Sequence, residues 1–139
     1  MPYVRLFYHF VWTTKGRLPL LRERTRTAIY GAMTTKITDL GGIVYALDGM
    51  PDHVHLVVTI PPRHSLSTFI GQTKGSSSHI ANYLADGAVD LPFAWQSEYG
   101  VLSLSERHLP LVVSYVQNQA EHHATHRLNA TLENDGTTP

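Results

Sequence analysis

Residues 53–60 read His-Val-His-Leu-Val-Val-Thr-Ile, the most informative run of the chain. The run is short and rich in β-branched and aliphatic residues, so it predicts a buried β-strand. Residues two apart on a strand point to the same face, about 7 Å apart at ~3.3 Å of rise per residue. His53 and His55 are therefore expected side by side on one face of a rigid element.

This histidine pair suits a divalent metal ion, since histidine is the commonest metal ligand in proteins. The chain has nine histidines in 139 residues, however, which makes an isolated pair of this spacing common by chance. The pair alone does not identify a metal site, and a further ligand has to come from elsewhere in the sequence.

The composition describes an ordinary globular protein of a single domain. The chain is 42% apolar and 16% charged, and it has no cysteine. Without cysteine, a disulfide scaffold, a thiolate zinc site and a cysteine nucleophile are excluded. No run approaches the ~18 apolar residues of a membrane span, and the first residues do not resemble a signal peptide. We expect a cytoplasmic protein of a bacterium or archaeon, with no membrane partner.

Basic residues are concentrated at the N-terminal end of the chain. The formal net charge is zero, which argues mildly against a nucleic-acid-binding protein. Residues 1–36 nevertheless carry seven lysines and arginines against a single glutamate. A charge-asymmetric chain can present one basic face while its net charge is zero. A solvated helix surface explains the same charges equally well.

Sequence patterns predict four strands and three helices. The strands are expected at residues 3–13, 43–48, 53–60 and 98–104, and the helices at residues 22–40, 65–84 and 110–127. A tight turn at residues 49–52 makes the second and third strands a hairpin, and a loop is expected at residues 85–94.

This order of elements predicts an α+β fold of the ferredoxin-like or RRM-like kind. Such a fold is an antiparallel four-stranded sheet with helices on one face, here followed by a C-terminal helix. Residues 1–128 are expected to form the single domain. The polar residues 129–139 are expected to be a disordered tail.

Tyr115 and Gln119 lie four residues apart on the last predicted helix. That spacing places both side chains on one face, a turn apart. By itself the pair indicates no chemistry, because a half-buried tyrosine whose hydroxyl bonds to the backbone is the ordinary case.

Five motifs in a fixed order give the chain a resemblance to a known family. They are residues 8–17 (YHFVWTTKGR), 50–56 (MPDHVHL), 74–78 (KGSSS), 95–100 (WQSEYG) and 115–123 (YVQNQAEHH). From residue 3 to residue 123 the chain resembles the single-tyrosine transposases of the HUH nuclease superfamily. These enzymes move small bacterial insertion sequences as single-stranded DNA, and their relatives include repeat-associated tyrosine transposases.

The resemblance implies a role for each of four residues. His53, His55 and Gln119 correspond to the ligands of a divalent metal ion, either Mg²⁺ or Mn²⁺, and Tyr115 corresponds to the nucleophile. The implied activity is that of a single-strand DNA endonuclease and strand transferase. It cleaves and rejoins DNA through a 5′-phosphotyrosine intermediate.

The resemblance also implies partners. They are single-stranded DNA with hairpin ends and a second copy of the chain, in a homodimer whose active sites are completed in trans. The candidate contacts to DNA are the basic side chains of Lys15, Arg17, Arg22 and Lys74. His9, His122 and His123 match the family's motifs, but the sequence assigns them no role.

Two other functions compete with this interpretation. One is a non-catalytic relative that kept the fold and binds single-stranded nucleic acid. The other is a small metal hydrolase that uses the histidines with a water nucleophile. The intact set of His53, His55, Tyr115 and Gln119 favours the transposase, because a binding module needs none of these residues.

Overall fold

A computed structural model describes residues 3–84, 92–125 and 127–137. Its strands are β1 (Phe7–Thr13), β2 (Ile43–Met50), β3 (His53–Thr59) and β4 (Gly100–Leu104), and its helices are α1 (Glu23–Asp39), α2 (Leu66–Leu84), α3 (Leu109–Gln117) and α4 (Gln119–Ala124). A short 3₁₀ turn at Lys15–Arg17 follows β1. Within the described residues, no helix has the length and apolar character needed to cross a membrane.

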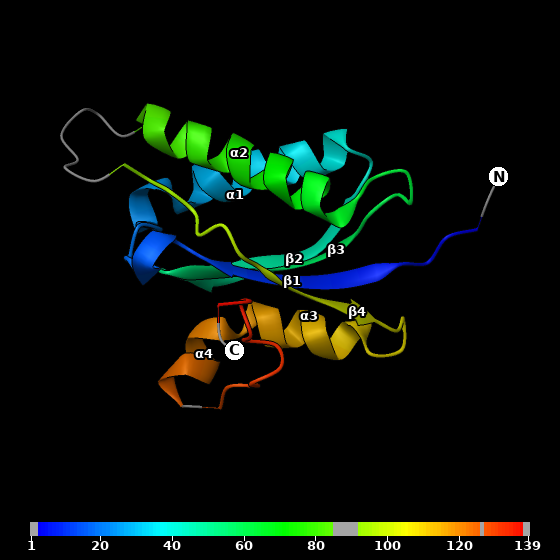
Figure 1. Ribbon diagram of the computed structural model, residues 1–139. Coiled ribbons are helices and arrows are strands. Elements are labelled where there is room, and N and C mark those ends of the chain that lie inside the picture. Colours follow the sequence, from blue (N-terminus) through cyan, green and yellow to red (C-terminus); the bar gives the residue numbers. More distant parts are fainter. Residues whose placement is uncertain (1–2, 85–91, 126, 138–139) are drawn as a thin grey trace.

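The four strands form one antiparallel sheet in the order β2-β3-β1-β4. This is the α+β, ferredoxin-like arrangement that the sequence predicted, and the hairpin between β2 and β3 is confirmed. Figure 1 shows α1 and α2 covering one face of the sheet, with α3 and α4 on the opposite face.

The two faces of the sheet bury different sets of side chains. The larger core lies under α1 and α2 and contains Phe10, Trp12, Ile29, Met33, Ile37, Val54, Leu56, Val58, Phe69 and Ile70. A smaller cluster under α3 contains Ala46, Val57, Val112 and Val116. Because β3 is covered on both sides, all but its last residue are buried, which explains its nearly continuous apolar run.

Strand β1 is shorter than the sequence predicted, because it begins at Phe7 rather than at residue 3. Its neighbour β3 ends at Thr59, opposite Phe7, and Pro61 and Pro62 follow, which cannot donate ladder hydrogen bonds. Val4 and Leu6 therefore lack a partner strand and remain 40% and 41% exposed.

The last helix was expected to run unbroken over residues 110–127, and this expectation is wrong. Helix α3 ends at Gln117, and Asn118 has the non-helical torsion angles φ −110° and ψ 30°. The side-chain amide of Asn118 donates to the carbonyl oxygen of Ser114 at 2.8 Å, a side-chain-to-backbone bond of the kind that competes with helical pairing. Helix α4 then starts at Gln119 in a new direction (Figure 1).

Residues 129–139 were expected to be disordered, but the structure places residues 129–137 against the sheet. Asp135 is 3% exposed and forms an ion pair with Arg17 at 3.1 Å. A Cβ atom at Gly100 would collide with the carbonyl oxygen of Asn134, and one at Gly136 would lie 2.5 Å from the carbonyl oxygen of Tyr99. The segment thus packs closely through polar and backbone contacts, which its low apolar content did not reveal. Most of the expected loop at residues 85–94, namely residues 85–91, lies outside the described residues.

Candidate active site

The two histidines of β3 lie on the face of the sheet that carries α3 and α4. His53 is 3% exposed and His55 is fully buried. Their ring centroids are 5.2 Å apart, as the two-residue repeat of a strand requires. The predicted pair on one face is therefore present.

Each histidine has one ring nitrogen fixed by a neighbour. His53 Nδ1 lies 2.7 Å from Asp52 Oδ1, and His55 Nδ1 lies 2.8 Å from His9 Nε2. In metal sites such outer contacts fix the tautomer and the ring orientation of the ligand. Here they leave the Nε2 atoms of both histidines to face the same space.

Gln119 reaches this space from the first position of α4. Its side chain is fully buried, and its Oε1 atom lies 3.2 Å from His53 Nε2 and 3.1 Å from His123 Nε2. The structure thus brings Gln119 to the two histidines, although it does so from a second helix rather than from the helix of Tyr115.

Glu133, which the sequence analysis did not single out, completes the cluster. Its Oε1 atom lies 3.1 Å from His55 Nε2 and 3.4 Å from His53 Nε2. Its Oε2 atom accepts hydrogen bonds from the Tyr115 hydroxyl at 2.5 Å and from the Gln119 amide at 3.3 Å. No sequence signal points to this residue, because it lies in a polar C-terminal segment without a periodic pattern or a recognised motif.

Tyr115 is held on both sides of its hydroxyl and on one face of its ring. The hydroxyl donates to Glu133 and accepts from the backbone N–H of Asn129 at 2.9 Å. The ring stacks on His122 with centroids 4.4 Å apart, and it lies 6.1 Å from the ring of His55. The sequence assigned no role to His122, and the structure shows that its ring packs against Tyr115.

The charges of the site follow from these contacts. Burial would raise the pKa of Glu133, but hydrogen bonds from His53 and His55 lower it strongly, so the carboxylate is ionised. Burial would lower the pKa of His53, whereas the carboxylates of Asp52 and Glu133 raise it to about 9. The His55 pKa is lowered, mainly by burial.

Burial also shifts the pKa values of His9 and Tyr115. It lowers the pKa of His9 to about 3, with a smaller effect from His55, so His9 is neutral. Burial and the hydrogen bond to Glu133 raise the pKa of the Tyr115 phenol to about 12, so the hydroxyl keeps its proton in this state.

The donor atoms fit a divalent metal ion. His53, His55 and Glu133 offer ligand atoms within 4.8 Å of one another, and the amide oxygen of Gln119 adjoins them. Adjacent ligands of an octahedral ion with bonds of ~2.1 Å are about 3 Å apart, close to the 3.1, 3.2 and 3.4 Å separations found here. The set holds two imidazole nitrogens and two oxygens and no thiolate, which several divalent metal ions accept.

Three of the four predicted DNA contacts lie at the end of the sheet that carries this cluster. Lys15, Arg17 and Arg22 are exposed, and the Arg17 guanidinium donates to Asp52, the residue that holds His53, at 3.2 Å. The fourth, Lys74, lies elsewhere. Its ammonium donates to the carbonyl oxygens of Gln96 and Glu98 at 2.8 and 3.0 Å.

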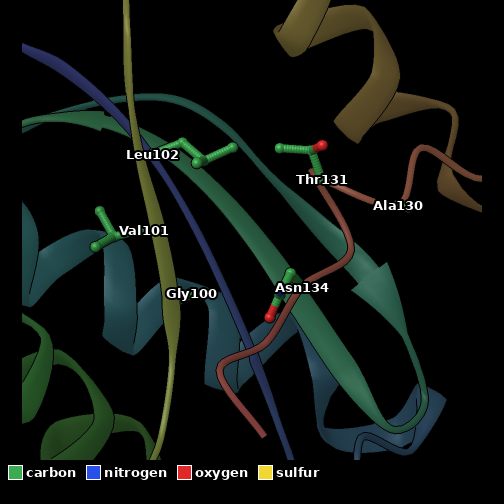
Figure 2. Close-up of a pocket in the computed structure, with 6 residues that line it drawn as sticks. All are labelled: Gly100, Val101, Leu102, Ala130, Thr131 and Asn134. Carbon is green, nitrogen blue, oxygen red and sulfur yellow. The ribbon is translucent and has the colours of Figure 1, made fainter. Parts of the chain in front are cut away.

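A groove of about 460 Å³ runs beside the cluster, between β4 and the C-terminal segment. It is lined by Gly100, Val101, Leu102, Ala130, Thr131 and Asn134. Figure 2 shows Leu102 and Thr131 facing one another across it, while Val101 points to the other side of β4. The groove lies next to Glu133, because Asn134, which lines it, follows Glu133 in the chain. Strand β4 is an edge strand of the sheet.

Comparisons with known proteins identify relatives of the chain. Residues 3–119 match the family described as IS200-like transposases. The ISDra2 transposase TnpA of Deinococcus radiodurans is 24% identical over 123 residues, which cover 83% of this chain and 84% of that protein. The transposase for insertion sequence element IS200 of Salmonella typhimurium is 32% identical over 72 residues, 51% of this chain and 47% of that protein.

Two solved structures share the fold. A crystal structure of a protein from Deinococcus radiodurans r1, described as a candidate transposase, has a TM-score of 0.67 and 29% identity, and covers 86% of this chain and 95% of that one. A REP-associated tyrosine transposase bound to a REP hairpin has a TM-score of 0.65 and 16% identity, and covers 88% of this chain and 74% of that one.

Proposed function

The chain belongs to the family of IS200-like transposases and is a DNA transposase, and we propose that it cleaves and rejoins single-stranded DNA through a covalent link to Tyr115. The observation that carries the proposal is the convergence of His53, His55, Gln119 and Tyr115 on one buried cluster, from three separate elements.

In this proposal His53, His55 and Gln119 hold a divalent metal ion, Mg²⁺ or Mn²⁺. When bound, the ion polarises the scissile phosphate and neutralises the charge that develops there. Asp52 and His9 orient the two imidazoles through their Nδ1 atoms. Coordination positions that these residues do not fill would be available to a phosphate oxygen of the DNA and to water.

Tyr115 supplies the nucleophile. Its phenol oxygen forms a bond to the scissile phosphorus, while the bond from phosphorus to the 3′-oxygen breaks. The phenol loses its proton, and the departing 3′-oxygen takes one up to become a 3′-hydroxyl. The DNA is then held as a 5′-phosphotyrosine, and attack by a second 3′-hydroxyl reverses the reaction and joins strands without an external energy source. A phenol is a weak nucleophile unless it is activated or held in position for attack. The contacts of Tyr115 with Glu133, Asn129 and His122 support positioning.

The proposed partner is single-stranded DNA that carries hairpin ends. A neighbour of the same fold is described as bound to a REP hairpin, and the exposed Lys15, Arg17 and Arg22 supply positive charge beside the cluster. Lys74 was the fourth candidate contact. We place it outside the path of the DNA, because backbone carbonyls already surround its ammonium.

We also propose that the chain forms a homodimer, as the resemblance implies. The sequence led us to expect active sites completed in trans, whereas the single chain described here brings Tyr115 and Gln119 to its own His53 and His55. The trans form requires α3 and α4 to be exchanged through the connection between β4 and α3, residues 105–108.

Mixing inactive variants separates the two arrangements. One protomer carries His55→Ala and the other carries Tyr115→Phe. A trans arrangement restores one intact site in each mixed dimer, so cleavage returns. A cis arrangement, which the contacts within one chain support, leaves both sites broken even when mixed dimers are shown to form.

The catalytic proposal is tested with labelled single-stranded DNA that carries a hairpin. In the presence of Mn²⁺ the protein should form an adduct with DNA that survives denaturation, and chelation of the metal or Tyr115→Phe should abolish it. Cleavage that persists in Tyr115→Phe would favour a metal hydrolase with a water nucleophile. DNA binding without cleavage in the unaltered protein would favour a non-catalytic binding module.

A further inference from the structure

Glu133 contacts both the histidine pair and Tyr115 through the two oxygens of one carboxylate. One carboxylate oxygen lies 3.1 Å from His55 and 3.4 Å from His53. The other accepts the hydrogen bond of the Tyr115 hydroxyl at 2.5 Å. The resemblance to other transposases assigned no role to this residue.

We propose that Glu133 is a fourth ligand of the metal ion and that its second oxygen positions the Tyr115 hydroxyl beside that ion. The proposal rests on the proposed function, since it assumes that His53, His55 and Gln119 hold a metal and that Tyr115 is the nucleophile. It adds an anionic ligand to a set that is otherwise neutral, and hard divalent cations prefer oxygen ligands of this kind.

Contacts of its neighbours in residues 129–137 hold Glu133 in position. Asp135 is buried in an ion pair with Arg17, and the carbonyl of Asn134 lies directly over Gly100. Asn129 anchors the start of the segment, because its N–H donates to the hydroxyl of Tyr115. Residues on both sides of Glu133 are thus tied to the domain, as a residue that orients a reacting group requires.

The second oxygen of Glu133 has a separate task. A tyrosine side chain has two torsion angles, and the hydrogen bond to Glu133 fixes where its oxygen lies relative to the histidines. Misplacing a reacting atom by ~1 Å is enough to cost on the order of 100-fold in rate. Glu133 therefore acts on Tyr115 as a positioning residue and on the metal ion as a ligand.

Metal binding is measured first, by calorimetry with Mn²⁺ and no DNA. Glu133→Gln keeps the shape of the side chain but removes its charge, and we expect Mn²⁺ affinity to fall by ~10-fold or more, as it does when metal-site partners are altered. Glu133→Asp keeps the charge on a shorter side chain and should retain part of the affinity. Glu121→Gln, on the exposed surface of α4, is the matched control and should bind Mn²⁺ as the unaltered protein does.

A second variant displaces Glu133 without altering it. Gly100→Ala places a methyl group against the carbonyl of Asn134 and should lower Mn²⁺ affinity in the same direction as Glu133→Gln. Gly71→Ala, at a helical position with open space around it, is its control. Circular dichroism and thermal unfolding verify that each variant keeps its fold.

Adduct formation is then compared at saturating Mn²⁺, where the affinity of the metal no longer limits the rate. We expect Glu133→Gln to form the adduct on the order of 100-fold more slowly, because the oxygen that aims Tyr115 has become an amide. Unchanged Mn²⁺ affinity in Glu133→Gln would overturn the ligand assignment. A faster reaction in this variant would overturn the positioning role and show that Glu133 blocks the site.

Tyr115→Phe separates this inference from the function on which it rests. If Tyr115→Phe loses the adduct while Glu133→Gln behaves like the unaltered protein, the inference fails and the proposed function stands. If Tyr115→Phe still forms the adduct, the proposed function itself fails, whatever Glu133→Gln does.

Discussion

At the scale of single residues, His55 uses both of its ring nitrogens. Its Nε2 atom faces the cluster, and its Nδ1 atom lies 2.8 Å from the Nε2 of the buried, neutral His9. If His55 binds a metal through Nε2, its proton resides on Nδ1, and His9 must accept it as a hydrogen bond. A neutral His9 can accept that proton and so supports the tautomer that a metal-bound His55 requires.

We expect His9→Phe to weaken Mn²⁺ binding by ~10- to 100-fold, the range observed when the outer partner of a metal ligand is removed. The substitution keeps an aromatic ring of similar size but offers no acceptor to His55. Calorimetry with Mn²⁺ measures the effect, with the exposed His79→Phe as control. Equal Mn²⁺ affinity in His9→Phe and the unaltered protein would contradict the tautomer argument.

Gln119→Ala should weaken Mn²⁺ binding and slow cleavage while the domain stays folded. The amide lies 3.2 Å from His53 and is fully buried, and removing a buried hydrogen-bonding group costs about 1–3 kcal/mol of stability. Urea denaturation checks the fold and calorimetry checks the metal. The assignment of the ligands is wrong if Mn²⁺ affinity is unchanged in both Gln119→Ala and His55→Ala.

Several site residues could be predicted from the sequence, and others could not. The two-residue repeat of a strand was enough to bring His53 and His55 together. Family position and a four-residue spacing then pointed to Tyr115 and Gln119. The contact of His9 with His55 depends on the register of two strands, β1 and β3, which are far apart in the chain. Glu133 depends on the path of a segment that has no periodic pattern at all.

At the scale of elements, Lys74 connects α2 to the segment that precedes β4. Its ammonium donates to the carbonyl oxygens of Gln96 and Glu98 and lies 5.9 and 5.6 Å from the ring centroids of Trp12 and Tyr99. Burial lowers the pKa of Lys74 to about 8. Such a lysine stabilises the fold rather than offering a free charge to DNA.

We expect Lys74→Met to reduce the free energy of unfolding by about 1.5–3 kcal/mol, the range for hydrogen bonds to a charged group. Methionine keeps the contacts of the aliphatic chain and removes the donors. Urea denaturation measures the loss, and DNA affinity measured at several salt concentrations should keep its slope. A flatter salt slope with unchanged stability would instead make Lys74 a phosphate contact.

The break between α3 and α4 shows where periodicity alone fails. The apolar spacing of residues 110–127 fits a single helix, and no proline or glycine interrupts it after Pro110. The interruption falls at Asn118, whose side-chain amide and backbone N–H both donate to the carbonyl of Ser114. Asparagine is compatible with a helix interior and with a helix end, so the sequence does not decide between them.

In the whole molecule, the apolar core and the candidate active site lie on opposite faces of the sheet. The face under α1 and α2 holds the main apolar core, and the opposite face holds the polar cluster together with the smaller group of Val57, Val112 and Val116. The order of elements was enough to predict the sheet. The order of elements does not show on which face of the sheet α3 and α4 pack, because that depends on tertiary contacts such as those of Val112 and Val116 with Val57.

The neutral chain should bind DNA through a local basic surface. Lys15, Arg17 and Arg22 lie beside the hairpin turn between β2 and β3, as shown by the contacts of Arg17 with Asp52 and of Leu21 with Pro51. The double variant Lys15→Ala/Arg22→Ala tests this surface. The slope of log affinity against log salt concentration should flatten by about 0.7 for each phosphate of single-stranded DNA that the variant no longer neutralises. Arg107→Ala, in the loop at the opposite end of the sheet, should leave the slope unchanged. Identical slopes in all three proteins would contradict this assignment.

In the proposed reaction the oxygen of Tyr115 becomes bonded to a 5′-phosphate of the DNA. Mass spectrometry of the denatured adduct detects this bond, after nuclease trimming of the DNA and proteolysis of the protein. We expect the remaining nucleotide to be attached, through its 5′-phosphate, to Tyr115 in the peptide that contains it. A nucleotide on any other residue, a link through a 3′-phosphate, or cleaved DNA with no modified peptide would contradict Tyr115 as the nucleophile.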